Sequence, residues 1–191
     1  MILFHPYLNA FKESQAETWD FLNKHKELFG SMGIEVYDKL CAHDNFKTYK
    51  QELINIWDRD SILILEMDIV PTEEALKDIV KCPEPLCAYD YSLYNETNTA
   101  VSAHRIKDPV DKRGWRNVRD EKFADYVGFG FTKIKKCIQH RISITQALPL
   151  DKFIGPDVGV SMATAELGLK WHIHYPALKH NHKPGEVRWN V

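Results

Sequence analysis

The sequence predicts a single-domain α/β fold in which a mostly parallel central sheet is flanked by helices. Its length of 191 residues suits one domain, so we expect residues 1–191 to share one core. Hydrophobic residues make up 44% and charged residues 27%, which is the balance of a globular protein. Short apolar runs alternate with helical patterns, and strands joined by helices form parallel sheets.

The first half of the chain shows this alternation most clearly. Residues 61–65, SILIL, form a continuous apolar run, which is typical of a central strand covered on both faces. Thr72 and the acidic residues after it are typical of a helix start. Strand patterns lie at 2–4, 34–37, 61–65 and 86–91, and helix patterns lie between them at 12–29, 45–57 and 72–80.

The second half of the chain is less regular. Residues 92–125 are polar and lack apolar periodicity, whereas 126–131 have a strand pattern that ends in a glycine-rich turn. The remaining expected elements are helices at 132–139 and 158–169 and a strand at 171–175, before a histidine-rich tail at 176–191.

Composition argues against several classes of protein. The 25 basic residues are balanced by 27 acidic ones, whereas a dedicated nucleic-acid binder is usually strongly basic. No run of about 18 apolar residues is present, so we expect no transmembrane segment. The first residues lack a basic region followed by a long apolar run, so we expect no signal peptide and a cytoplasmic protein.

The cysteines and histidines give only a weak indication of a metal site. Cys41, Cys82, Cys87 and Cys137 are too scattered for a disulfide scaffold or a CxxC zinc site, so we expect thiols without a function. The alternation of residues 171–175 puts His172 and His174 on one strand face. A transition-metal site is one interpretation of the histidine-rich segment. With no cysteine nearby in the sequence, we favour a single histidine ligand and structural roles for the others.

The strongest candidate for chemistry is a pair of acids. Glu66 and Asp68 directly follow the apolar run 61–65, and ligands of open α/β sheets bind at the carboxyl ends of strands. Carboxylate oxygens are the ligands that Mg²⁺ and Mn²⁺ prefer. The alternative is a solvated turn before the next helix.

Several motifs together resemble those of GT-A fold glycosyltransferases. LILEMDIVPTEEAL resembles their strand and acid-x-acid motif, and LCAYDY resembles the strand that follows it. YVGFGF resembles their glycine-rich acceptor-side loop, Gly155-Pro156-Asp157 the acid at a helix start, and HYPALKHNH the C-terminal histidine segment. The resemblance implies a GT-A (Rossmann-like) domain, with a nucleotide-sugar-binding half at 1–91 and an acceptor-side half and tail at 92–191. The short length is similar to that of compact members from archaeal viruses, which would place the protein in a host cytoplasm.

The resemblance also implies an activity and a cofactor. The reaction would move a sugar from a nucleotide-diphospho-sugar to an acceptor hydroxyl, with Mn²⁺ or Mg²⁺ neutralising the diphosphate. Asp68 would hold the metal, and Glu66 would contact the donor ribose or metal-bound water. His180 or His182 would join the same cation.

The remaining site residues follow from the same resemblance. Asp157 is the expected general base, with Asp151 as a rival; their other interpretations are a helix cap and a surface turn. Gly128 and Gly130 would let the backbone approach donor or acceptor, or would only permit a turn. The basic segment 104–122 would fold over the diphosphate, or would be a solvated loop.

Other functions use similar residues. A nucleotidyltransferase would need a glycine-rich loop near the N-terminus, and residues 2–11 contain no glycine. A two-metal nuclease could use Glu66, Asp68 and Asp157, and a non-catalytic sugar-nucleotide-binding module would need fewer groups. Because few residues follow His180, we expect an open acceptor side that suits a large glycan or glycoprotein, or an accessory protein that completes it.

Overall fold

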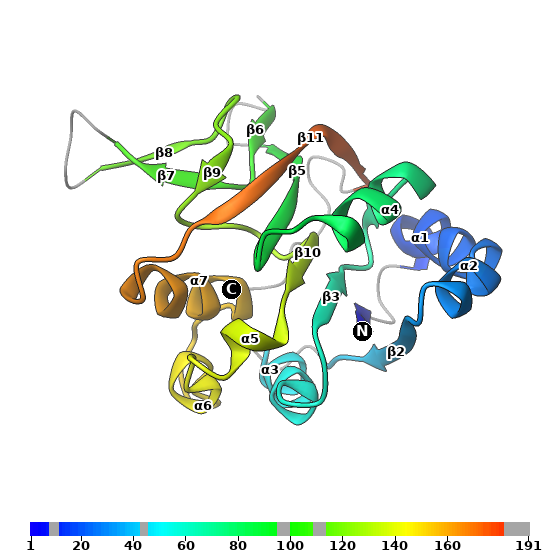
Figure 1. The fold of residues 1–191 in the computed structure, drawn as a ribbon, viewed down its shortest axis with the longest axis horizontal. Coiled ribbons are helices and arrows are strands. Elements are labelled where there is room, and N and C mark those ends of the chain that lie inside the picture. Colours follow the sequence, from blue (N-terminus) through cyan, green and yellow to red (C-terminus); the bar gives the residue numbers. More distant parts are fainter. Residues whose placement is uncertain (8–11, 43–45, 95–99, 109–113, 182–191) are drawn as a thin grey trace.

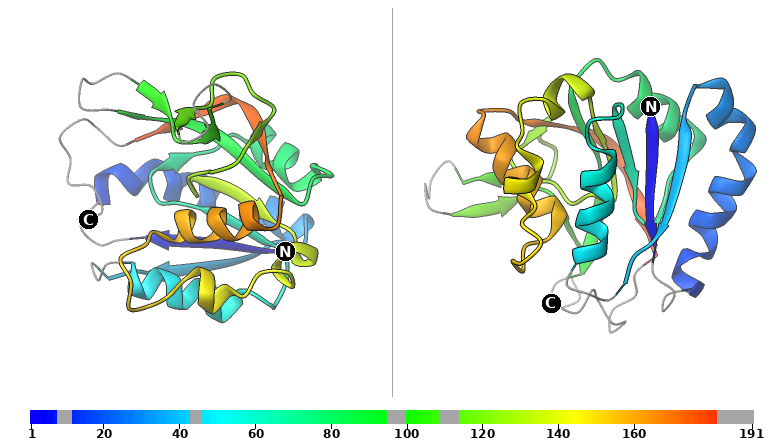
Figure 2. Two further views of the ribbon diagram at one scale, coloured as in Figure 1. Left: turned by 90° about the vertical axis from the view of Figure 1, so that its left-hand side faces the viewer. Right: turned by 90° about the horizontal axis from the view of Figure 1, so that it is seen from below.

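The computed structural model describes residues 1–7, 12–42, 46–94, 100–108 and 114–181. These residues form a mixed sheet with helices on both of its faces (Figures 1 and 2). The strand order along the sheet is β2-β1-β3-β10-β5-β11-β4, with β6 paired to β5 and β9 paired to β11. The strands are β1 (Ile2–Tyr7), β2 (Glu35–Leu40), β3 (Ile62–Leu65), β4 (Ile69–Val70), β5 (Leu86–Tyr94), β6 (Ala100–Ser102), β9 (Phe123–Ala124), β10 (Phe131–Ile134) and β11 (Trp171–His180).

The expected α/β class with a mostly parallel sheet is confirmed. Strand β1 pairs in parallel with β2 and β3, and β5 pairs in parallel with β11. Strand β10 runs antiparallel between β3 and β5. The polar segment 92–125 holds further short strands, including the hairpin of β7 (Arg105–Lys107) and β8 (Trp115–Asn117).

The sheet separates two apolar cores. Successive side chains of a strand point to opposite faces, so Phe4 and Ile64 belong to one core and Leu3 and Leu63 to the other. The first core is covered by α3 (Lys47–Ile56), α5 (Lys136–Gln139), α6 (Ile144–Ala147) and α7 (Pro156–Glu166). The second is covered by α1 (Lys12–Lys24), α2 (Lys26–Ser31) and α4 (Glu73–Lys81). This double burial explains why the run 61–65 is apolar throughout.

Several expected elements have different boundaries. The strand expected at 171–175 continues to His180, so the first residues of the expected tail belong to β11, and the helix expected at 158–169 spans Pro156–Glu166. The helix expected at 12–29 is two helices separated at His25. The strand expected at 126–131 begins only at Phe131, because the residues before it form a turn against β5. The helix expected from 132 begins at Lys136, since residues 131–134 are buried strand residues and Lys133 among them hides the apolar pattern.

Thr72 caps α4 as the sequence predicts. Its hydroxyl accepts a 3.1 Å hydrogen bond from the backbone N–H of Ala75. Among the described helices, none has the length and apolar character needed to cross a membrane.

Candidate functional site

The acids that follow β3 lie in a loop held from two sides. The backbone N–H of Glu66 donates to the carbonyl of Gly130 at 2.8 Å, and that of Ile69 donates to the carbonyl of Glu66 at 3.3 Å. Strand β4 then pairs with the end of β11. The loop is therefore fixed between the turn before β10 and the last residues of β11.

Asp68 and His180 meet because β4 and β11 are paired. His180 lies opposite Ile69, and the N–H of Asn181 donates to the carbonyl of Asp68 at 2.8 Å. The His180 Nδ1 lies 3.0 Å from the carbonyl oxygen of Ser92, and its Nε2 lies 3.2 Å from Asp68 Oδ2. Since a carbonyl oxygen only accepts, Nδ1 carries a proton. The contact of Nε2 with the carboxylate then requires a second proton or a cation between the two atoms.

Asp157 approaches the same loop from the first turn of α7. Its charge acts on Glu66 and on the hydroxyls of Tyr49 and Tyr91. Tyr49, on α3, donates a 3.1 Å hydrogen bond to Glu66 Oε1. The structure thus brings together Glu66, Asp68, Asp157 and one of the two candidate histidines.

The carboxyl groups of this cluster have perturbed pKa values. Burial, followed by the charges of Asp68 and Asp157, raises the pKa of Glu66 to about 8. Burial also raises the pKa of Asp157, although backbone N–H groups and the charge of Arg105 oppose that shift. Neighbouring carboxylates resist ionising together. Their oxygen atoms could hold a hard divalent cation, which prefers oxygen donors.

The two glycines of the 126–131 segment make room for an aromatic ring. A Cβ on Gly128 would lie 2.1 Å from the Tyr91 hydroxyl oxygen, and one on Gly130 would lie 2.5 Å from Tyr91 Cε1 and 2.9 Å from Ile69 Cγ1. The N–H of Gly128 donates to His104 Nδ1 at 3.2 Å. These contacts give both glycines a packing role; an approach to donor or acceptor stays a prediction.

The other predicted site residues lie away from the acid cluster or outside the described residues. Asp151 lies in an exposed turn, where its charge acts on the Lys50 ammonium group. His182 lies outside the described residues. In the basic segment, the positive charge of Arg105 lowers the pKa of Asp157. Trp115, on β8 of the hairpin, is 41% exposed.

Sequence reasoning missed three residues of this site. Tyr49 belongs to the buried face of a helix, and Tyr91 follows a buried strand pattern, so both look like core residues. His5 is fully buried on β1, where Nδ1 lies 2.7 Å from the Leu65 carbonyl oxygen and Nε2 has no hydrogen-bond partner among the described residues. The order of the strands in the sheet is what places His5 next to the loop that carries Glu66 and Asp68, which we call the acid loop.

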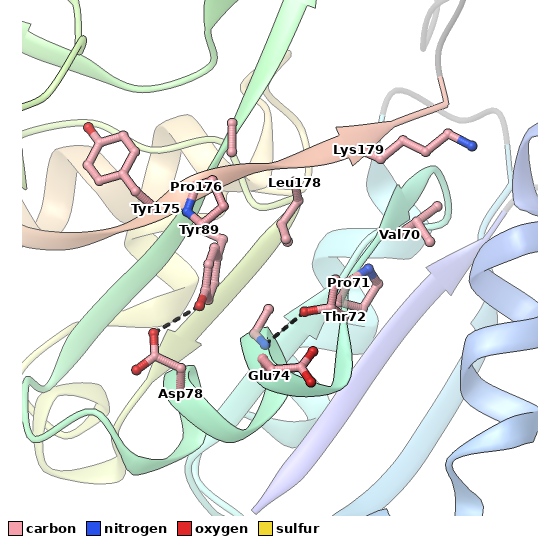
Figure 3. Close-up of a pocket in the computed structure, with 12 residues that line it drawn as sticks. Val70, Pro71, Thr72, Glu74, Asp78, Tyr89, Tyr175, Pro176, Leu178 and Lys179 are labelled. Atoms are coloured by element: carbon pink, nitrogen blue, oxygen red, sulfur yellow. Dashed lines mark hydrogen bonds between the residues drawn. The ribbon is translucent and has the colours of Figure 1, made fainter.

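A groove runs beside the site between α4 and the second half of β11 (Figure 3). Its volume is about 520 Å³, and its walls include Val70, Thr72, Tyr175 and Lys179. On one wall Tyr89 donates a 2.8 Å hydrogen bond to an oxygen of Asp78 (Figure 3).

Comparisons with known proteins add little to this geometry. No protein-family model matches the sequence, and no curated protein sequence matches it. A crystal structure of a glycosyltransferase involved in the glycosylation of the major capsid of PBCV-1 aligns over 91% of this chain and 80% of that chain. The identity is 9% and the TM-score is 0.46, which is too distant a likeness to indicate a function.

Proposed function

We propose that this protein is a metal-dependent glycosyltransferase that moves a sugar from a nucleotide-diphospho-sugar to an acceptor hydroxyl. One observation carries the proposal: Glu66, Asp68, Asp157 and His180 gather at the carboxyl end of β3. Ligands of open α/β sheets bind at such ends. The motif resemblance of the sequence supports the same reaction class.

The donor groups fit a hard divalent cation, Mn²⁺ or Mg²⁺. Asp68 Oδ2 and His180 Nε2 would hold it directly, because they already face each other at 3.2 Å. The Ser92 carbonyl fixes the ring of His180 from behind, as an outer hydrogen bond commonly does for a histidine ligand. Glu66 would contact metal-bound water or the donor ribose. When bound, the cation would neutralise the charge of the leaving diphosphate.

Asp157 would supply the base. Its carboxylate would take the proton of the acceptor hydroxyl as the acceptor oxygen forms a bond to the sugar carbon and the sugar–phosphate bond breaks. The electron pair of that bond leaves with the diphosphate. Burial raises the pKa of Asp157, which makes its carboxylate a better proton acceptor than an exposed aspartate.

The acceptor side would be open to a large molecule. Phe153 and Val158, on either side of the start of α7, are 45% and 42% exposed, and Met162 on the same helix is 44% exposed. Apolar side chains exposed beside Asp157 support a glycan or glycoprotein acceptor, or an accessory protein that completes the acceptor site.

Calorimetric titration of nucleoside diphosphates, with and without Mn²⁺, tests the proposal. Wild type should bind one of UDP or GDP only with Mn²⁺, and Asp68→Asn should lose that binding. Asp58→Asn is the matched control, because Asp58 is exposed at the opposite end of β3 and should bind like wild type. A folded wild type that binds no nucleoside diphosphate with Mn²⁺ would contradict the proposal and favour a nuclease.

A further inference from the structure

Two cysteines and two histidines from distant parts of the sequence meet at the edge of the second core. Cys82 directly follows α4, Cys87 lies on β5, and His172 and His174 lie on β11. One potential ligand atom from each lies within 4.8 Å of all the others. The expectation that no cysteine lies near these histidines is therefore wrong in space, although it holds along the sequence. The parallel register puts His172 directly opposite Cys87 and brings the two sequence regions together.

We propose that Cys82, Cys87, His172 and His174 form a binding site for Zn²⁺. Two sulfur and two imidazole ligands are a donor set that selects zinc over magnesium and manganese. The site is separate from the oxygen-rich cluster of Glu66 and Asp68, and it does not depend on the proposed transferase function.

The distances suit tetrahedral coordination. Zinc–ligand bonds of about 2.3 Å to sulfur and about 2.0 Å to nitrogen would put sulfur and nitrogen ligands about 3.5 Å apart and two nitrogens about 3.3 Å apart. Cys82 Sγ lies 3.4 Å from His172 Nδ1, which lies 3.3 Å from His174 Nε2. The two sulfur atoms, 3.0 Å apart, would have to separate by about 0.8 Å. A small rotation of one cysteine side chain provides that movement.

The surroundings already orient one ligand. His174 Nδ1 lies 2.6 Å from Asp78 Oδ2, and Tyr89 donates to the same oxygen at 2.8 Å. A carboxylate that accepts from Nδ1–H leaves Nε2 unprotonated and directed at the other three ligands. Carboxylate–histidine–zinc arrangements of this kind are common in zinc sites. Asp78 is therefore a positioning residue for the metal.

Charge and access also fit zinc. Zn²⁺ would displace the two thiol protons to solvent, and its complex with two thiolates and two neutral imidazoles carries no net charge. A neutral complex suits a site in which Cys82, Cys87 and His174 are buried, while partly exposed His172 leaves a route for the ion. Because four protein ligands fill a tetrahedral site, the role is structural. The ion would join the end of α4 to β5 and β11.

Metal content and cobalt spectroscopy of the full chain, purified with a phosphine reductant, test the site. We expect one equivalent of zinc per chain, and we expect Co²⁺ to give tetrahedral d–d bands with thiolate charge-transfer absorption. Free zinc at about 1,000 times the dissociation constant should raise Tm by about 10 °C. Excess Mn²⁺ should displace neither ion.

Matched variants locate the ion. Cys87→Ser should weaken Co²⁺ binding and reduce the charge-transfer absorption, whereas Cys137→Ser, which changes the exposed cysteine on α5, should leave both unchanged. Asp78→Asn should keep the spectrum but weaken affinity about 10–100-fold. The proposal is overturned if reduced, folded wild type binds no Co²⁺ with thiolate absorption, or if Cys87→Ser binds Co²⁺ like wild type.

Discussion

Replacing Gly130 by alanine tests the packing of the acid loop. An added methyl group would lie 2.5 Å from Cε1 and 2.9 Å from Cδ1 of Tyr91, and 2.9 Å from Ile69 Cγ1. Tyr91 is only 5% exposed and its aromatic ring is rigid, so either the whole ring or the Gly130 backbone must move to make room for the methyl group. Overpacking of this kind costs about 1–3 kcal/mol of unfolding free energy. At about 2–4 °C per kcal/mol for a chain of this size, Tm should fall by about 2–12 °C.

The assay is thermal unfolding followed by circular dichroism, with Gly30→Ala as the control. Gly30 lies in α2, where an added Cβ meets nothing within 4 Å. Alanine is favoured over glycine in a helix by about 0.5–1 kcal/mol, so Gly30→Ala should raise Tm by a few degrees. The same chemical change should thus have opposite effects at the two positions.

A double-mutant cycle identifies the cause. If the Tyr91 ring is the obstacle, Gly130→Ala should cost less in a Tyr91→Ala background, with a coupling energy of about 1 kcal/mol or more. Equal Tm values for Gly130→Ala and wild type, or strictly additive costs in the cycle, would refute this account of the turn.

Three further changes have defined outcomes. Thr72→Ala should cost about 1 kcal/mol by removing the acceptor for the Ala75 N–H, while Thr72→Ser should cost much less, as measured by denaturant unfolding. Burial lowers the pKa of His5 to about 4 in the folded protein. As pH falls from 6.5 to 4, His5 is therefore protonated in the unfolded chain before it is protonated in the folded one, and stability falls. The free energy of unfolding of wild type should fall by up to about 3 kcal/mol across that window. The fall should be smaller for His5→Asn, which retains a donor for the Leu65 carbonyl, when thermal unfolding is measured at a series of pH values. Asp157→Asn should lower transfer to an acceptor by about 10²–10⁴-fold in a product assay but keep Mn²⁺-dependent nucleotide binding; loss of both would mean a binding role.

The sequence predicts most of the fold because one physical signal is strong. A strand covered on both faces has to be apolar throughout, and β3 is recognisable for that reason. Thr72 marks a helix start through its own capping chemistry. By contrast, β10 contains Lys133, whose ammonium group reaches the Cys82 carbonyl at 2.7 Å within the protein. A buried lysine with a backbone partner looks polar in sequence, so the pattern from residue 132 predicts a helix where the structure has a strand.

The candidate site was only partly predictable for a related reason. Glu66 and Asp68 are visible because they directly follow an apolar strand, and Asp157 because it begins a helix. Tyr49 contacts Glu66 through its hydroxyl and Tyr91 packs its ring against the glycine turn, but both have largely apolar side chains, so periodicity assigns them to the core. The contact of His180 with Asp68 depends on the pairing of β4 with β11, which local sequence does not specify.

Strand β11 connects the two proposed cation sites. Its first residues carry His172 and His174 beside Cys87, and its last residue, His180, meets Asp68. A zinc ion at the first site would fix the strand's start against β5, whereas its end is held by the two-residue pairing with β4, the pairing of Leu178 with Tyr91 and the contact of His180 with Ser92. Zinc removal should therefore weaken Mn²⁺-dependent nucleotide binding by displacing His180. Calorimetry on zinc-loaded and zinc-free protein measures that dependence, and equal affinities would show that the end of β11 is held independently of its start.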